Sequence, residues 1–68
     1  MIYILHDEYR SGEMWAFKSR DGLVDQAAKL LNEDSVEFGV DGDNNTWGVH
    51  VPGRYAPIAR VRIIKLHS

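Results

Sequence analysis

Apolar residues alternate with other residues along two short segments near the start of the chain. Residues 2–7 place two isoleucines on one face of an extended backbone and a tyrosine and a leucine on the other, which predicts a strand. Residues 14–18 predict a second strand. The link between them is short and contains Gly12, which can adopt a positive φ, so we expect the two strands to pair antiparallel.

The spacing changes at residues 20–32, where apolar residues recur every three or four positions, as in an amphipathic helix. The apolar stripe of this helix consists of Leu23, Val24, Ala27, Ala28, Leu30 and Leu31. Ser19 or Asp21 can act as the N-cap, and Asn32 can act as the C-cap. We predict a single helix in the chain.

The middle of the chain predicts a β-hairpin that turns at Asn44 and Asn45, because asparagine tolerates positive φ. The register that follows pairs Val40 with Val49, Phe38 with Val51, and Trp47 with Gly42. We expect all six residues to face the core, since one face of a paired strand is buried. The opposite face then carries Glu37, Gly39, Asp41, Asp43, Thr46, Gly48 and His50.

Residues 58–66 predict the last strand. One face carries Ala59, Val61 and Ile63, and the other carries Ile58, Arg60, Arg62, Ile64 and Leu66. Apolar residues on both faces toward its end indicate an inner or interface strand. The elements together predict a single domain of the α+β class over residues 1–68, a five-stranded, mainly antiparallel sheet with one helix on one face, in the order β-β-α-β-β-β. The uncovered sheet face is then solvated or pairs with a partner.

Charge is distributed unevenly along this nearly neutral chain. Residues 32–53 contain five acidic residues and no Lys or Arg, whereas residues 54–68 contain four basic residues and no acid. Glu33 and Asp34 follow the helix at its negative end, where acidic residues are unfavourable, so we expect another reason for their presence. Two oppositely charged segments also allow two copies to dock, which makes a homodimer an expectation.

Composition excludes several classes of protein. The chain has no cysteine, which excludes disulfides, thiolate catalysis and Cys-ligated zinc. The N-terminus lacks the pattern of a signal peptide, and no apolar run approaches the roughly 20 residues of a membrane helix. We therefore expect a soluble, cytoplasmic protein without a membrane partner.

Motifs for catalysis or metal binding are not evident. The three histidines lack metal-ligand spacing, and the segment from Asp41 to Asn45 lacks the glycine and glutamate of a calcium loop. No nucleophile motif or Gly-rich phosphate loop is present. We expect no metal, no cofactor and no enzyme activity. The weakest alternative is a hydrolase-like site in which Asp41 or Asp43 pairs with His50.

Two charged surfaces remain as candidates for function. The acidic one, with Asp34, Glu37, Asp41 and Asp43 as electrostatic anchors, would dock on a larger partner with a basic surface, since spaced carboxylates imitate phosphates. Loop residues of the types that dominate binding hot spots, Tyr9, Arg10 and Tyr55, would add contacts. A plain solvated sheet face is the alternative interpretation of these acids.

The basic surface supports a second hypothesis, a small nucleic-acid-binding regulator. It would use Arg54, Arg60, Arg62 and Lys65, with Tyr55 as an aromatic platform. The isoelectric point near 5.8 argues against this hypothesis. Protection of a sheet edge by positive charge, or pairing with acids of the same molecule, would also explain these residues.

Parts of the chain resemble very small phage-encoded proteins. The resemblance lies in the opening Ile2-Tyr3-Ile4-Leu5, the segment from Trp15 to Ser19 and the helix with Ala27-Ala28. The closing Arg60-Val61-Arg62-Ile63 is similar to the last strand of short phage inhibitors of host RNA polymerase. Anti-CRISPR proteins share the size, the acidic patches and the β-β-α arrangement. This resemblance implies a stoichiometric protein that blocks a host machine by binding it.

Overall fold

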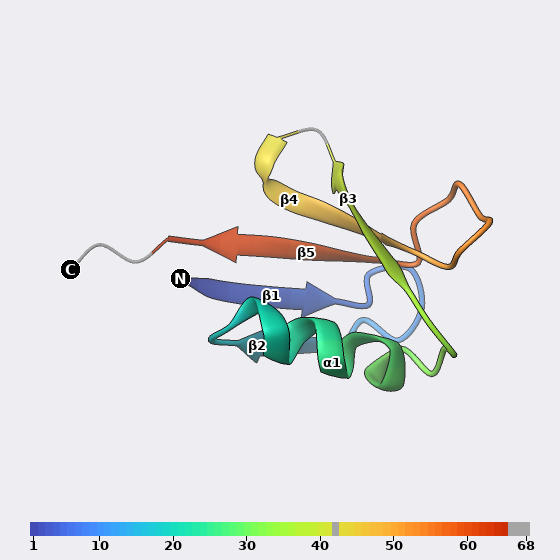
Figure 1. The fold of residues 1–68 in the computed structure, drawn as a ribbon, viewed down its shortest axis with the longest axis horizontal. Helices are drawn as coiled ribbons and strands as arrows, with labels where there is room; N and C mark the ends of the chain where they lie inside the picture. Colours follow the sequence, from blue (N-terminus) through green and yellow to red (C-terminus); the bar gives the residue numbers. More distant parts are fainter. Residues whose placement is uncertain (42, 66–68) are drawn as a thin grey trace.

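The computed structural model describes residues 1–41 and 43–65, without the side chains of residues 41–44. It confirms the α+β class and the predicted element order. The elements are β1 (Ile2–His6), β2 (Met14–Phe17), α1 (Arg20–Leu30), β3 (Glu37–Asp41), β4 (Asp43–His50) and β5 (Ala59–Ile64). The strands form one sheet in the order β2-β1-β5-β4-β3, and every neighbouring pair is antiparallel. Figure 1 shows α1 alongside β1 and β2, with the β3–β4 hairpin beyond β5.

β5 occupies the centre of the sheet, which confirms that it is an inner strand. Val61 pairs with Leu5 of β1 on one side and with Trp47 of β4 on the other. Ala59 and Val61 are buried on one face of β5, as predicted. Arg60, Arg62 and Ile64 alternate with them and lie on the opposite face. Leu66, expected on that opposite face, lies outside the described residues. The free edges of the sheet are therefore β2 and β3.

The predicted N-cap of the helix is confirmed at Ser19, whereas the C-cap is Leu31 and not Asn32 as predicted. The hydroxyl of Ser19 accepts a hydrogen bond of 3.1 Å from the backbone N–H of Gly22, so Ser19 rather than Asp21 is the N-cap. Asn32 has φ of 60° and donates its N–H to the Lys29 carbonyl oxygen at 3.2 Å. This left-handed residue lies one position beyond the C-cap Leu31 and stops the helix two residues earlier than predicted.

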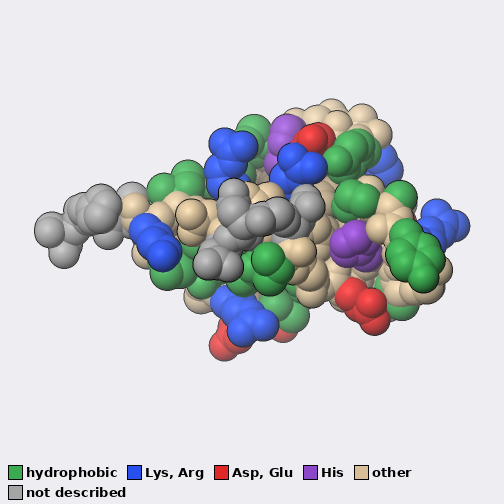
Figure 2. Space-filling view, turned by 90° about the horizontal axis from the view of Figure 1, so that it is seen from above, with side chains coloured by type: hydrophobic (Ala, Val, Ile, Leu, Met, Phe, Trp, Pro, Cys, Tyr) green, Lys and Arg blue, Asp and Glu red, His purple; other side chains and the backbone are tan. Residues whose placement is uncertain are grey.

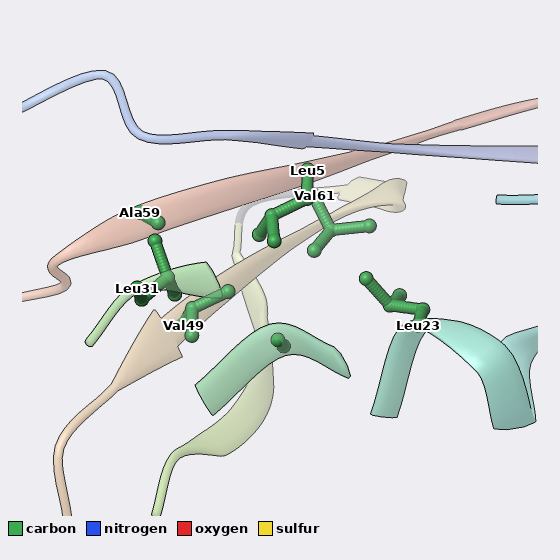
Figure 3. Close-up of a cluster of buried hydrophobic side chains, with 7 residues drawn as sticks. Leu5, Leu23, Leu31, Val49, Ala59 and Val61 are labelled. Carbon is green, nitrogen blue, oxygen red and sulfur yellow. The ribbon is translucent and has the colours of Figure 1, made fainter. Parts of the chain in front are cut away.

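The core lies between α1 and one face of the sheet. Its buried side chains are Leu5, Leu23, Ala27, Leu31, Val49, Ala59 and Val61. Figure 3 shows Leu23 and Leu31 directed toward Leu5, Val49 and Val61 from the strands. Val24, predicted in the apolar stripe, is instead 45% exposed. The buried stripe is narrower than predicted because the helix packs against the sheet mainly through Leu23, Ala27 and Leu31, which are four residues apart.

The register of the β3–β4 hairpin differs from the prediction by two residues. Phe38 pairs with Val49 and Val40 pairs with Trp47, and a bulge follows Val40 before Asp41 pairs with Asp43. Asn44 and Asn45 lie within β4, so they are not the turn. Gly42, the predicted partner of Trp47, lies outside the described residues.

Trp47 and Val40 both lie on the predicted face of the hairpin, but only Trp47 packs against the core, so the predicted core position is wrong for Val40. Because side chains alternate with a period of two, a two-residue shift keeps Phe38, Val40, Trp47 and Val49 on their predicted face. Trp47 packs against the core, with its ring 5.7 Å from the ring of Tyr3 and 6.2 Å from that of Phe38. Val40 is on the same face but is 72% exposed, since it lies on the edge strand beyond the reach of the helix.

Candidate binding surfaces

Three connections between elements meet at one end of the sheet, which we call the loop end (Figure 1). They are residues 7–13, 31–36 and 51–58. Because β1 and β4 are both antiparallel to β5, they run in the same direction and their following loops emerge together. The loop end carries Tyr9, Arg10, Asp34, Arg54 and Tyr55, with Glu37 at the adjoining start of β3. Five of the seven residues predicted to contact a partner are therefore on neighbouring segments.

The two tyrosines of the loop end differ in how they are held. Tyr55 is 99% exposed and, with Gly53 and Arg54, lines a shallow hollow of about 260 Å³. Tyr9 is 52% exposed, and its hydroxyl oxygen accepts a hydrogen bond of 3.2 Å from Nη2 of Arg60. Tyr55 is thus the most accessible aromatic side chain among the described residues.

Arg10 connects the first loop to the end of the helix. Its Nη1 donates to Oε1 of Glu33 at 3.3 Å, and its Nη2 donates to the backbone carbonyl oxygen of Leu31. Its Nε donates to Oδ1 of Asp7 at 3.4 Å. The contact with Arg10 places a positive charge next to Glu33, which offsets the unfavourable position of Glu33 at the negative end of the helix. Arg10 therefore makes contacts within its own molecule, in addition to the contact with a partner that was predicted for it.

Asp7, which sequence reasoning did not single out, organises the same loop. It is only 5% exposed, and its Oδ2 accepts hydrogen bonds from the Ser11 hydroxyl at 3.0 Å and the Ser11 N–H at 3.4 Å. Its backbone oxygen accepts from the N–H of Gly12 at 2.8 Å. Gly12 has φ of 76°, as its turn position requires. The sequence did contain a signal of this turn. Asp7 directly follows a strand and lies four residues before Ser11, a spacing at which an aspartate side chain can accept hydrogen bonds from the loop that follows it.

The acidic residues follow the free edge strand β3 rather than forming one compact patch. Asp34 precedes β3, and Glu37 begins it opposite His50; both acids are exposed. Asp41 and Asp43 pair with each other at the other end of β3, and their side chains lie outside the described residues. His50 is thus four residues along the hairpin from Asp41, about 13 Å. The strand register therefore separates the residues of the suggested hydrolase-like site.

The basic residues are divided between different parts of the surface. Arg60 and Arg62 lie on the sheet face opposite α1, Arg54 is at the loop end, and Lys65 follows β5. In the view of Figure 2, Lys and Arg side chains are dispersed among hydrophobic ones and form no continuous patch. Because β5 is central, protection of a sheet edge does not explain its charges. A homodimer formed by strand pairing would have to use β2 or β3.

Metal-ligand geometry and membrane-spanning helices are not found in the described part of the chain. Within residues 1–41 and 43–65, no three His, Asp or Glu side chains are grouped so that they could hold a metal ion. The only helix described there is too short and too polar to cross a bilayer. Comparison of the chain with protein-family models, with curated proteins and with solved structures found no match in any of the three.

Proposed function

We propose that this chain is a non-enzymatic binding protein that inhibits or regulates a larger protein with a basic surface. The docking surface is the loop end together with the adjoining start of β3. The observation that carries this proposal is the gathering of exposed Tyr55 and Tyr9 with the exposed acids Asp34 and Glu37 at one end of the sheet. These residues are far apart in sequence and are brought together by the strand order.

The chemistry of the loop end suits a protein partner. Aromatic side chains dominate the energetics of protein interfaces, and Tyr55 offers its whole ring at little ordering cost. Asp34 and Glu37 add negative charge at the same end of the sheet, which speeds encounter with a basic surface and orients the complex. The contacts of Arg10 with Asp7 and Leu31 hold the first loop in one conformation, which reduces the entropy lost on binding.

The proposed partner class includes nucleic-acid-processing machines, because their basic grooves are made for phosphates and accept spaced carboxylates. On this proposal the chain acts stoichiometrically in the host cytoplasm, in the manner of phage-encoded inhibitors of host RNA polymerase or anti-CRISPR proteins. Asp41, which ends β3, and Asp43, which begins β4 opposite it, would extend the acidic contact to the far end of the hairpin.

Affinity capture from a bacterial lysate, followed by mass-spectrometric identification, tests this function. A basic partner captured by the wild-type chain should be lost with Tyr55→Ala and with Glu37→Lys. Matched controls are Val24→Ala and Asp25→Lys on the outer face of α1, which should retain it, since both residues are exposed and distant from the loop end. Equal capture by all four variants, or equal loss, would contradict the proposed surface.

A further inference from the structure

The sheet face opposite α1, which we call the open face, carries a groove over its β2-β1-β5 half. Its volume is about 450 Å³. It is lined by Ile4, His6, Glu8, Met14, Arg60, Arg62 and Ile64. The strand pairing accounts for this set, because His6 pairs with Met14 and with Arg60, and Ile4 pairs with Arg62. No described element covers this face, since the single helix lies on the other side of the sheet.

Two of the apolar side chains that line the groove are exposed. Met14 is 61% exposed and Ile64 is 41% exposed, with half-buried Ile4 between their strands. Such side chains contribute binding energy when a partner removes them from water. Met14 can also adjust its shape to a ligand because its side chain is unbranched and polarizable.

Two guanidinium groups stand beside this apolar strip. Nη1 of Arg60 lies 3.7 Å from Oε1 of Glu8, and the hydrogen bond to Tyr9 holds the same side chain from the loop. Arg62 lies two residues further along β5 on the same face and is exposed. Two arginines against one glutamate leave the groove positively charged, which calls for an anionic ligand.

We propose that this groove binds an acidic, aliphatic segment of a partner protein. A carboxylate of the segment would pair with exposed Arg62, because a guanidinium fork matches a carboxylate with two parallel hydrogen bonds. Its aliphatic side chains would pack on Ile4, Met14 and Ile64. Nucleic acid fits less well, since the groove lining contains no Phe, Tyr or Trp side chain and offers only the imidazole of His6 for base stacking. This surface adjoins the loop end at Glu8 but lies on the open face of the sheet, away from Tyr55, and goes beyond the function proposed above.

Titration of isotopically labelled protein, followed by methyl NMR, tests the inference with defined probes. A short peptide of glutamate and leucine should shift the methyl resonances of Ile4, Met14 and Ile64. The same peptide with lysine in place of glutamate should not shift them. Arg62→Glu should weaken binding of the acidic peptide by about tenfold or more, as removal of a charged hot spot does. The matched control Lys29→Glu, on exposed helix surface, should leave it unchanged.

Several outcomes would overturn the inference. They are no shift with the acidic peptide, equal shifts with the lysine peptide, or tighter binding of single-stranded DNA at the same methyls. Shifts of these methyls with protein concentration alone would assign the groove to a second copy of the chain. Unchanged resonances of Leu5 and Leu23 verify that each variant is folded. Tyr55→Ala should not affect peptide binding, so failure here is distinguishable from failure of the loop-end proposal.

Discussion

The guanidinium of Arg10 joins the Asp7 carboxylate to the backbone carbonyl oxygen of Leu31. Asp7 directly follows β1 and Leu31 caps the helix, so this one side chain fastens the loop between β1 and β2 to the end of α1. The carbonyl groups at a helix C-terminus otherwise need water or another donor. The loop that carries Tyr9 is therefore positioned by the helix rather than by its own turn alone.

Replacement of Arg10 by alanine should lower the free energy of unfolding by about 1.5–3 kcal/mol, the range for hydrogen bonds to charged groups. The variant leaves the buried Asp7 with fewer donors and the Leu31 carbonyl oxygen without its side-chain partner. Urea unfolding monitored by tryptophan fluorescence measures the loss. Arg54→Ala, which removes an exposed arginine, should change stability by less than about 0.5 kcal/mol. Equal effects of the two substitutions would show that the Arg10 contacts do not stabilise the fold.

Loss of the helix N-cap is a second measurable effect. Ser19→Ala removes the acceptor for the Gly22 N–H and should cost about 1 kcal/mol of stability. Ser35→Ala makes the same chemical change in the exposed link before β3 and should cost much less. Thermal unfolding followed by circular dichroism compares the two variants. A larger effect at Ser35 would place the helix start elsewhere.

The core and the edge strand should respond differently to loss of an apolar side chain. Leu5→Ala removes a fully buried side chain beneath the helix and should destabilise the protein by about 2–5 kcal/mol. Val40→Ala removes a side chain that is 72% exposed and should change stability by less than about 0.5 kcal/mol. Chemical denaturation of both variants tests this difference. A large loss for Val40→Ala would show instead that Val40 is packed against other side chains, contrary to its exposure on the edge strand.

Alanine should have opposite effects at two glycines. A Cβ added to Gly39 meets no atom within 4 Å, so Gly39→Ala should stabilise the protein by about 0.4–1 kcal/mol through the unfolded state. Gly12 has φ of 76°, where an L side chain is strained, so Gly12→Ala should destabilise it by about 1–2 kcal/mol. Melting temperatures of the two variants give the sign directly. The same sign at both positions would contradict the backbone geometry described here.

Local patterns predicted most of the secondary structure because local interactions determine it. The three-and-four spacing from Leu23 to Leu31 and the Ser19 hydroxyl act within a single turn or two of helix. The alternation in residues 58–66 likewise identified the buried and open faces of β5. Val24 was misassigned because the width of a helix's buried stripe depends on what it packs against.

The hairpin register could not be obtained in the same way. The sequence offers two turn signals close together, Asp41-Gly42 and Asn44-Asn45, and both favour positive φ. The choice between them depends on tertiary packing, in which Val49 is buried beside Phe38 and Trp47 packs on Tyr3. Alternation predicted the faces but not the pairing, because both registers put Phe38, Val40, Trp47 and Val49 on the same face.

The candidate sites depended still more on long-range structure. The sequence identified Tyr9, Asp34 and Tyr55 as separate contact residues, but only the strand order brings their segments to one end of the sheet. The groove on the open face requires β1, β2 and β5 to be neighbours. No local pattern predicts that the first and last strands of the chain pair with each other.

That pairing has a consequence for how the chain folds during synthesis. Ile2 pairs with Ile64 and Leu5 with Val61, so nearly the whole chain must be made before the central strand pair can form. Closing such a long loop is slow because its entropy is lost before the contacts are gained. Until then β1, β2 and α1 have only part of their core, and their apolar surfaces remain available to chaperones. Truncation before residue 59 should therefore leave a ribosome-bound chain sensitive to protease throughout, rather than a smaller folded unit.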